Sequence, residues 1–415
     1  MSSASNKRVI LLIGDGMADR PHPALNGRTP LEAAQTPYLD KLAREGENGI
    51  MDVIAPGIRV GSDTGHLAIL GYDPYEVYTG RGPFEATGIG MQVLGGDVAF
   101  RCNFSTVDPQ MVITDRRAGR ITEGTDQLAA AVNGVEFEGV TCYFKESVAH
   151  RGALVLRGEG LSAAITDTDP HEVGRAVWQA RAITAGDAAA EKTARVVNAF
   201  VQYSYNQLDS HPVNVARRDA GLAPANIILP RGSGEAPHIT SFNEKNLLTG
   251  ACVAETGLIK GIANFVGLAN IDAPGATGGL DTEVMSIGQT VLQALETHTF
   301  VLCNVKGPDV AAHDFNPAAK VEIIERIDAM VGMLIAQAPA ETLIVVTADH
   351  TTACSYGDHT GEPVPVVIWG TEVRTDAVSS YGERTCATGG LGRFSGKNLV
   401  NMLTSLMNVQ EKFGA

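Results

Sequence analysis

The segment VTADHTTACSYGDHTGEPVPVVIWG, residues 346–370, places one acid and two imidazoles between two runs of β-branched apolar residues. Asp349 and His350 are adjacent, and His359 follows in a loop that contains glycine. Carboxylate and imidazole together suit Mn, Zn, Co or Fe better than Ca, which prefers oxygen ligands alone. A lone histidine in such a loop is more often an ordinary loop or core side chain, so a metal site here depends on ligands from elsewhere in the chain.

Three aspartates each follow an apolar run that predicts a parallel strand. Asp15 closes RVILLIG, Asp309 follows TFVLCNV, and Asp349 follows TLIVVT. The carboxyl ends of parallel strands meet at the ligand-binding edge of an open α/β sheet. One aspartate there would fit a helix N-cap or a turn, but several carboxylates at one edge repel unless a cation neutralises them. With His313 in DVAAH, the set predicts two metal sites that share this edge.

The candidate nucleophile lies in PGIRVGSDTGHLAILGYDP, residues 56–74. Ser62 precedes an apolar stretch that predicts a helix, so it would lie at a helix N-terminus, where unpaired amides favour an anion. Its simpler alternative role is that of an N-cap. A hydroxyl bound to a divalent cation ionises near neutral pH and attacks phosphorus, so Ser62 beside the metal edge predicts phosphoryl transfer. Thr64 is the weaker candidate, and the sequence contains no G-x-S-x-G, P-loop or Rossmann fingerprint.

Strands that alternate with helices must position these residues. Short Val- and Ile-rich runs predict buried strands, and capped amphipathic stretches predict helices. The predicted strands lie within 8–17, 299–309, 342–350 and 364–370, and the predicted helices within 36–46 and 316–339. This alternation predicts a doubly wound α/β domain.

The middle of the chain, residues 76–240, differs in composition and residue pattern, with more glycine and shorter alternating stretches. It predicts two helices, around 170–182 and 187–203. We interpret it as a smaller α+β domain inserted into the α/β domain, which would then comprise residues 1–75 and 241–415.

Composition excludes several classes of protein. Charged residues make up 19% and hydrophobic residues 44% of the 415 residues, as in globular proteins. The net charge of −15 argues against a nucleic acid partner, because such binding depends on Lys and Arg. The six cysteines lack C-x-x-C spacing, which predicts buried free thiols in a reducing compartment. We find no signal peptide and no run of about 20 apolar residues, so we expect a cytoplasmic protein without a membrane partner.

Motifs along nearly the whole chain carry a resemblance to a known family. They are LLIGDGMADRP, PGIRVGSDTGHLAILGYDPYEVYTGRGPFEATG, DVAFRCNFSTV, RRAGRI, DTDPHE, GLIKGIA, PGATGG, VKGPDVAAHD, ERID and VVTADHTTACSYGDHTGEPVPV. With these motifs the chain closely resembles the archaeal-type, cofactor-independent (2,3-bisphosphoglycerate-independent) phosphoglycerate mutases of the alkaline phosphatase superfamily.

The resemblance implies a three-layer phosphatase-like domain interrupted by a transferase domain. It implies two divalent metal ions, with Mn²⁺ preferred and Mg²⁺, Co²⁺ or Zn²⁺ as alternatives, and no 2,3-bisphosphoglycerate. One ion would be held by Asp15, Ser62, Asp349 and His350, and the other by Asp309, His313 and His359. The substrate 3-phosphoglycerate would transfer its phosphoryl group to Ser62, and the reoriented glycerate would take it back on the 2-hydroxyl.

A mutase of this kind needs side chains that clamp the substrate carboxylate and phosphate, and a domain that closes to exclude water. The candidates are His150, Arg151, Arg231 and Lys260, with Arg117 and Arg120 as weaker ones. Each of them taken alone fits a solvated surface charge equally well.

Three other functions compete with a mutase. A metal-dependent phosphohydrolase would share every ligand and differ only in how well the site excludes water. A phosphotransferase would pass the phosphoryl group to another small alcohol, such as homoserine. A non-enzymatic metal-binding scaffold would lack the nucleophile or a ligand, and none is missing from this sequence. The sequence leaves open whether the chain forms a homo-oligomer.

Overall fold

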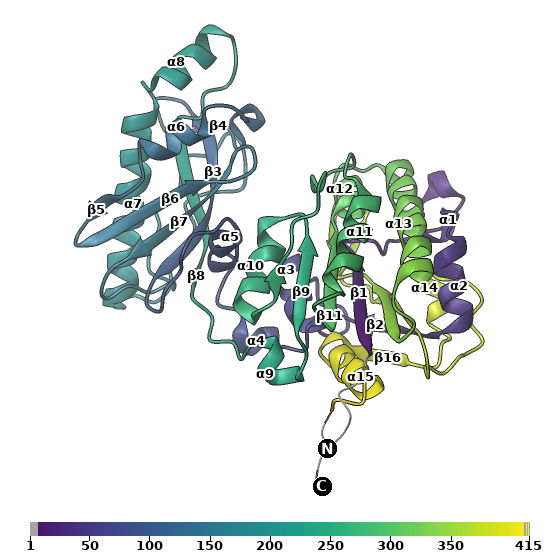
Figure 1. The fold of residues 1–415 in the computed structure, drawn as a ribbon. Helices are drawn as coiled ribbons and strands as arrows, with labels where there is room; N and C mark the ends of the chain where they lie inside the picture. The colour runs from purple at the N-terminus through teal and green to yellow at the C-terminus, as the bar shows by residue number, and fades with distance from the viewer. Residues whose placement is uncertain (1–6, 411, 413, 415) are drawn as a thin grey trace. The chain divides into compact units, whose positions relative to one another are not determined.

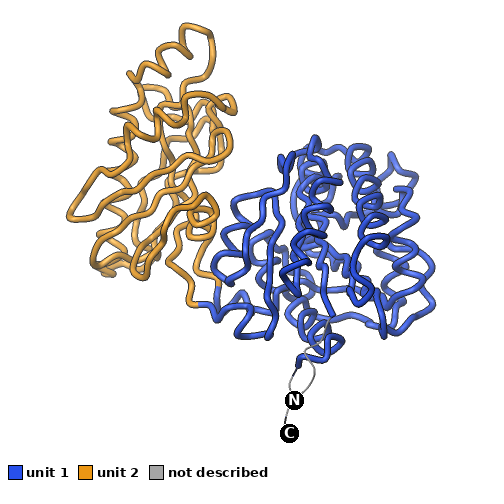
Figure 2. Tube along the Cα trace, in the orientation of Figure 1, with its two compact units in different colours: residues 1–77, 239–415 blue, residues 78–238 orange. Residues whose placement is uncertain are grey.

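The chain folds into two compact units, which Figure 2 shows in different colours. The computed structural model describes residues 7–410, 412 and 414. Unit 1 comprises residues 1–77 and 239–415, and unit 2 comprises residues 78–238. Both junctions lie two residues from the bounds expected from the sequence.

An eight-stranded sheet forms the centre of unit 1, in the order β10-β9-β11-β1-β12-β15-β2-β16 (Figure 1). The strands are β1 (Arg8–Gly14), β2 (Glu47–Asp52), β9 (Gly250–Ala254), β10 (Ala269–Asn270), β11 (Phe300–Val305), β12 (Thr342–Thr347), β15 (Val364–Trp369) and β16 (Gly392–Ser395). Residues Val9 to Ile13 of β1 are 0% exposed, as expected for a strand whose two faces are covered by helices. β1 is paired in parallel with β11 on one side and β12 on the other. The three strands predicted to end in aspartates are therefore neighbours.

One predicted strand has the opposite direction in the sheet to the one that its sequence pattern predicts, which is that of a parallel strand. Residues 364–370 contain β15, as expected, but β15 is antiparallel to both β12 and β2. The reason is that β12 continues into a short hairpin, β13 (Thr351–Ala353) and β14 (Asp358–Thr360), which returns the chain to the same edge of the sheet without a crossover helix.

Helices flank the sheet of unit 1 and complete the predicted three-layer architecture. They are α1 (Pro30–Ala33), α2 (Pro37–Glu45), α3 (Ser62–Ile69), α4 (Pro74–Val77), α9 (Phe242–Asn246), α10 (Gly257–Val266), α11 (Val284–Ala294), α12 (Gly307–His313), α13 (Pro317–Gln337), α14 (Glu383–Cys386) and α15 (Leu399–Leu406), with 3₁₀ turns at Pro23–Leu25 and Gly396–Asn398. The two predicted helices are α2 and α13. As expected, Asn316 caps α13, because its side chain accepts a hydrogen bond from the amide of Ala319.

A buried ion pair connects α13 to the loops at the carboxyl ends of the central strands. Lys320 on α13 is 0% exposed. Its Nζ donates to Asp19 Oδ2 at 2.8 Å, to the carbonyl of Thr352 at 2.8 Å and to the carbonyl of Ala18 at 3.1 Å. All three ammonium donors are used, so this one side chain joins the loop after β1 to the β13–β14 hairpin.

Replacing Lys320 with methionine is expected to lower the free energy of unfolding by about 3–5 kcal/mol, because it leaves the Asp19 carboxylate buried without its counter-charge. Urea denaturation of the purified variant measures this loss. The matched control is Lys41→Met, which removes an exposed lysine that pairs with Glu45 and is expected to cost less than about 1 kcal/mol. Equal losses in the two variants would contradict the assignment of Lys320 as a structural anchor.

Unit 2 is an antiparallel sheet packed against helices, and it matches the predicted α+β class. Its strands are β3 (Val98–Val107), β4 (Ile113–Asp115), β5 (Val135–Phe137), β6 (Val140–Glu146), β7 (Arg151–Arg157) and β8 (Ile227–Glu235), in the order β4-β3-β7-β6-β5 with β8 also paired to β3. Its helices are α5 (Gly82–Gly88), α6 (Thr125–Ala130), α7 (Ala188–Leu208) and α8 (Pro212–Asp219), with a 3₁₀ turn at Ala118–Arg120. Phe104, Phe144 and Phe200 meet in its core.

One of the two helices predicted in this unit is wrong. The prediction at 187–203 corresponds to α7, which Asp187 caps, but residues 170–182 form no helix. Isolated bridges pair Val112 with Ala176 and Ile165 with Ala182. Backbone pairing with distant residues therefore overrides the local helical preference in this segment.

Two expectations drawn from composition concern the whole chain. The six cysteines are free and buried, as predicted. Among the described residues, we find no helix with both the length and the apolar character needed to cross a bilayer.

Candidate active site

The carboxyl edge of β1, β11 and β12 brings the three predicted aspartates together in unit 1. Asp15 directly follows β1, Asp309 lies in the first turn of α12 after β11, and Asp349 follows β12. Asp15 and Asp349 are 0% exposed and Asp309 is 2% exposed. Gly16 has a φ of +57°, and a Cβ there would lie 2.4 Å from Thr352 Oγ1, so the close approach of these loops requires glycine.

The three predicted histidines reach the same edge from a loop, a strand and a helix. His350 precedes β13 and His359 lies on β14, and their rings stack with centroids 3.7 Å apart. His313 lies at the end of α12, and its ring centroid is 5.2 Å from that of His359. Two groups result, in which the ligand atoms lie within 4.8 Å of one another: Asp15, Asp349 and His350, and Asp309, His313 and His359.

Hydrogen bonds fix the same tautomer in all three histidines. Nδ1 of His359 lies 2.7 Å from the carbonyl of Val60, and Nδ1 of His313 lies 2.8 Å from the carbonyl of Gly357. A carbonyl only accepts, so each Nδ1 carries the proton. The same holds for His350, whose Nδ1 is 2.9 Å from Thr352 Oγ1, because this hydroxyl donates its own proton to Asp309 at 2.8 Å.

The tautomers leave each Nε2 lone pair directed at the carboxylates, as in metal-binding histidines. Nε2 of His313 and of His359 each lie 3.4 Å from Asp309 Oδ1. In the other group, Asp349 Oδ2 is buried without a hydrogen-bond partner, and such an atom is costly unless a cation or donor meets it. The donor set therefore fits divalent cations on chemical grounds.

Ser62 lies beside His350 of the first group. It is the first residue of α3, as predicted, and it is 6% exposed. Its Oγ is 3.1 Å from His350 Nε2 and 3.4 Å from Lys306 Nζ. Thr64, the weaker candidate nucleophile, donates its hydroxyl to the carbonyl of Gly61 at 3.2 Å. The structure thus brings the hydroxyl of Ser62, and both predicted ligand groups, to one place.

Electrostatics at this edge favour a charged Asp309 and a neutral His350. Burial is the main cause that lowers the pKa of His350 to about 3. Burial opposes ionisation of Asp309, but the charge of Lys306 holds its pKa well below its ordinary value. Burial likewise disfavours the charged form of Lys306, yet Asp15, Asp309 and Asp349 hold its pKa above the ordinary range.

Sequence reasoning missed three residues that contact the predicted ligands. Lys306 precedes α12, and its Nζ reaches Asp15 and Asp309. Asn304 on β11 donates to Asp15 Oδ2 at 3.0 Å. Nδ1 of His66 on α3 lies 2.7 Å from the carbonyl oxygen of Ser62 and 3.4 Å from Asp349 Oδ2. The motif VKGPD and the alternation within β11 were available signals, since Asn304 lies near the carboxyl end of a buried strand and Lys306 directly follows that strand, at the same edge as Asp309.

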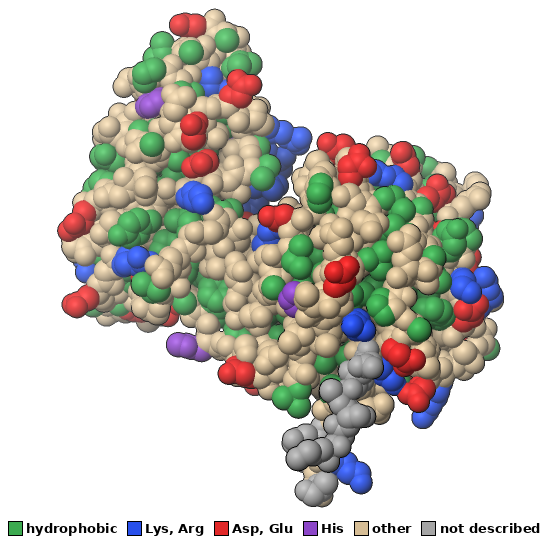
Figure 3. Space-filling view, viewed as in Figure 1, with side chains coloured by type: hydrophobic (Ala, Val, Ile, Leu, Met, Phe, Trp, Pro, Cys, Tyr) green, Lys and Arg blue, Asp and Glu red, His purple; other side chains and the backbone are tan. Residues whose placement is uncertain are grey.

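In unit 2, strand register assembles several predicted substrate ligands on one face of the sheet. Arg231 on β8 lies opposite Arg101 on β3, and Arg151 on β7 lies opposite Asn103 on β3. Residues two apart on a strand share a face, so Arg101 and Asn103, which the sequence analysis did not propose, join Arg151 and Arg231. Figure 3 shows Lys and Arg side chains gathered on part of the surface of this unit.

Several buried polar atoms on this face of the sheet have no hydrogen-bond partner. The Nε atoms of Arg101 and Arg231, Nδ1 of His150 and Oδ1 of Asn103 are buried without hydrogen-bond partners. Burial, followed by the charges of Arg151, Arg117, Arg101 and Arg120, lowers the pKa of His150 to about 4. Two of these atoms, the Nε atoms of the arginines, are donors, and buried donors without hydrogen-bond partners are costly unless a ligand accepts from them.

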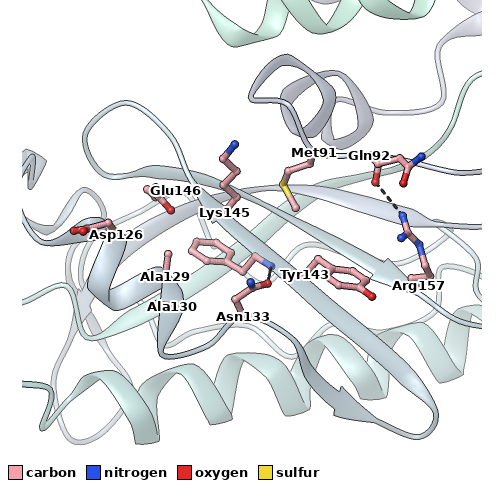
Figure 4. Close-up of a pocket in the computed structure, with 11 residues that line it drawn as sticks. Met91, Gln92, Asp126, Ala129, Ala130, Asn133, Tyr143, Lys145, Glu146 and Arg157 are labelled. Carbon is pink, nitrogen blue, oxygen red and sulfur yellow. Dashed lines mark hydrogen bonds between the residues drawn. The ribbon is translucent and has the colours of Figure 1, made fainter.

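The remaining predicted ligand, Lys260, and the residues that line the open cavity of unit 2 belong to neither of these clusters. Lys260 on α10 of unit 1 pairs with Asp272, with Nζ 2.5 Å from Oδ1. A cavity of about 430 Å³ in unit 2 is shown in Figure 4, where Arg157 donates to the carbonyl of Gln92. The predicted site residues do not line this cavity, and Arg157 is already paired with Asp97.

Comparison with known proteins shows the family of the chain. The profile "2,3-bisphosphoglycerate-independent phosphoglycerate mutase" matches residues 43–214. A phosphoglycerate mutase of that name from Methanothermobacter thermautotrophicus is 52% identical over 99% of this chain and 100% of its own length. The chain belongs to this family. A second relative, from Methanosphaera stadtmanae, is 51% identical over 98% of this chain and 99% of its own length.

Solved structures agree with membership of the mutase family. A Pyrococcus horikoshii protein has a TM-score of 0.86 at 37% identity and covers 99% of both chains. A cofactor-independent phosphoglycerate mutase from Thermoplasma acidophilum has a TM-score of 0.69 at 36% identity, over 97% of this chain and 100% of its own. The profile "Type I phosphodiesterase / nucleotide pyrophosphatase" matches residues 166–364. The family and the fold class predicted from the sequence are confirmed.

Proposed function

We propose that this enzyme interconverts 3-phosphoglycerate and 2-phosphoglycerate through a phosphoserine at Ser62. The observation that carries the proposal is that Ser62 Oγ lies 3.1 Å from His350 of one Asp/His group and 3.4 Å from Lys306 Nζ, which also contacts Asp309 of the other group. Membership of the mutase family supports the mutase against a phosphohydrolase and against a phosphotransferase acting on another alcohol. A non-enzymatic scaffold is also disfavoured, because the nucleophile and every predicted ligand are present.

We infer that the two groups hold two divalent cations, with Mn²⁺ preferred. Asp15, Ser62, Asp349 and His350 would hold one, and Asp309, His313 and His359 the other. Bound there, the cations would lower the pKa of the Ser62 hydroxyl and neutralise charge on the phosphoryl oxygens. The chain itself positions the ligands through Thr352, which links His350 to Asp309.

Each of the two phosphoryl transfers forms one bond to phosphorus and breaks another. Ser62 Oγ attacks the phosphorus of 3-phosphoglycerate, the bond from phosphorus to the 3-oxygen breaks, and the proton lost by Ser62 is balanced by the proton gained at the 3-oxygen. Glycerate then reorients, and its 2-hydroxyl takes the phosphoryl group from Ser62 in the reverse sense. Retention of glycerate between the steps requires exclusion of water, since water at this point would produce inorganic phosphate.

We infer that unit 2 supplies the side chains that bind the substrate anions. His150, Arg151 and Arg231 keep the roles expected of them, and the shared sheet face adds Arg101 and Asn103 to the set. Arg117 contributes to the positive potential around His150. Guanidinium groups suit bidentate contacts with carboxylate and phosphate. Lys260 stays a weaker proposal because it is paired with Asp272.

The test is to strip the protein with chelator, restore Mn²⁺ and follow 3-phosphoglycerate by phosphorus NMR without 2,3-bisphosphoglycerate. The expected result is Mn²⁺-dependent appearance of the 2-phosphoglycerate signal until equilibrium, with no inorganic phosphate. Stripped protein in chelator is the control. Accumulation of inorganic phosphate would show a hydrolase instead, and an unchanged substrate would reject phosphoglycerate as the substrate.

A further inference from the structure

A single lysine contacts both ligand groups of unit 1. Nζ of Lys306 lies 2.6 Å from Asp15 Oδ1 and 2.7 Å from Asp309 Oδ2. Asp15 belongs to one Asp/His group and Asp309 to the other. The ammonium group therefore bridges the two groups, and it does so at distances typical of charge-assisted hydrogen bonds.

The position of Lys306 is set by the fold rather than by a flexible side chain. Its backbone amide donates to Glu255 Oε2 at 2.6 Å, and Glu255 Oε1 accepts from the amide of Gly278 at 3.1 Å. The side chain is only 19% exposed. Since Lys306 lies at the junction of β11 and α12, its ammonium group is directed to the strand edge from which Asp309 also projects.

Charge balance suggests what the ammonium group does there. Asp15, Asp309 and Asp349 are carboxylates packed at one buried edge, and carboxylates this close repel one another in a low dielectric. Lys306 offsets part of that repulsion. Two divalent cations would carry more positive charge than the three carboxylates neutralise, so the cations and the ammonium group would repel each other at the same oxygens.

We propose that Lys306 is a resident counter-ion of this edge, which stabilises the carboxylates and competes with divalent cations for Asp15 and Asp309. The inference rests on the proposed two-cation centre and adds to it a residue that sets cation affinity. It predicts that removing the charge of Lys306 strengthens cation binding. If Lys306 only shaped the site, its replacement would weaken cation binding or leave it unchanged.

The test compares Mn²⁺ affinity and thermal stability among charge variants. Lys306→Met is expected to lower the Mn²⁺ dissociation constant about tenfold, within the range usual for coupling between sites. After chelator treatment its Tm is expected to fall by about 3 °C or more relative to wild type. Lys306→Arg, which keeps the charge, is expected to bind Mn²⁺ like wild type, and Lys41→Met is the matched control for losing a lysine from unit 1. Titration calorimetry and differential scanning calorimetry give the two readouts.

The outcomes separate this inference from the proposed function. If Lys306→Met binds Mn²⁺ as tightly as wild type or more weakly, Lys306 does not compete with the cations. This result would overturn the inference even if the protein is an active mutase. Wild-type protein that binds no Mn²⁺ overturns the cation centre and the competition together. If stripped Lys306→Met does not refold, its affinity is measured on folded protein against a chelating dye, and the same comparison decides.

Discussion

Ser62→Ala is expected to reduce the rate of 3-phosphoglycerate isomerisation by on the order of 10⁴-fold or more, because it removes the atom that forms the bond to phosphorus. The substitution deletes one oxygen from a side chain that is 6% exposed, so the fold and its Tm are expected to change little. The rate is measured by a coupled assay for 2-phosphoglycerate formation at saturating Mn²⁺.

Thr64→Ala is the matched control for the Ser62 prediction. Thr64 is in the first turn of the same helix, and its hydroxyl is already satisfied by the carbonyl of Gly61, so its loss is expected to leave the rate within a few-fold of wild type. Acid quench followed by mass spectrometry provides an independent readout, since one phosphoryl group is expected on the peptide that contains Ser62. A phosphopeptide at Thr64, or an active Ser62→Ala variant, would assign the nucleophile elsewhere.

Asp349→Asn is expected to remove one of the two cations and to lower activity by at least about 10²-fold. Replacing even residues that only support metal ligands costs 10–100-fold, and Asp349 is a proposed ligand. The amide oxygen of asparagine can still accept the hydrogen bond that Gly16 donates to Asp349 Oδ1 at 3.0 Å. The loss therefore reports the missing negative charge at Oδ2, which is buried without a hydrogen-bond partner.

Metal analysis after gel filtration checks the Asp349 prediction, with an expected change from two Mn²⁺ per chain to one. Asp328→Asn is the matched control, because Asp328 is also buried in unit 1 but accepts hydrogen bonds from the amides of Tyr38 and Leu39. That variant is expected to keep both ions. Full Mn²⁺ content and activity in Asp349→Asn would show that this carboxylate is not a ligand.

The fold and the residues of the site could be predicted from the sequence to different extents. Strand runs that end in aspartate were sufficient for β1, β11 and β12, since hydrophobic strands buried on both faces have a strong local signature. The helix expected at 170–182 was wrong, because backbone pairing of Ala176 and Ala182 with distant residues replaced it. The antiparallel direction of β15 was missed for a related reason, since strand direction depends on the connection and not on the run itself.

The sequence by itself determined the chemistry of this protein: the aspartates, histidines and Ser62 are of the types that hold cations and transfer phosphoryl groups, and their motifs identify the family. Only the tertiary structure decided which partners tune them. Lys306 bridges Asp15 and Asp309, which lie far apart in the chain, and Arg101 joins Arg231 through cross-strand register. Contacts of this kind arise when separate strands meet at one edge or face, and no local pattern in the sequence records where two distant segments will meet.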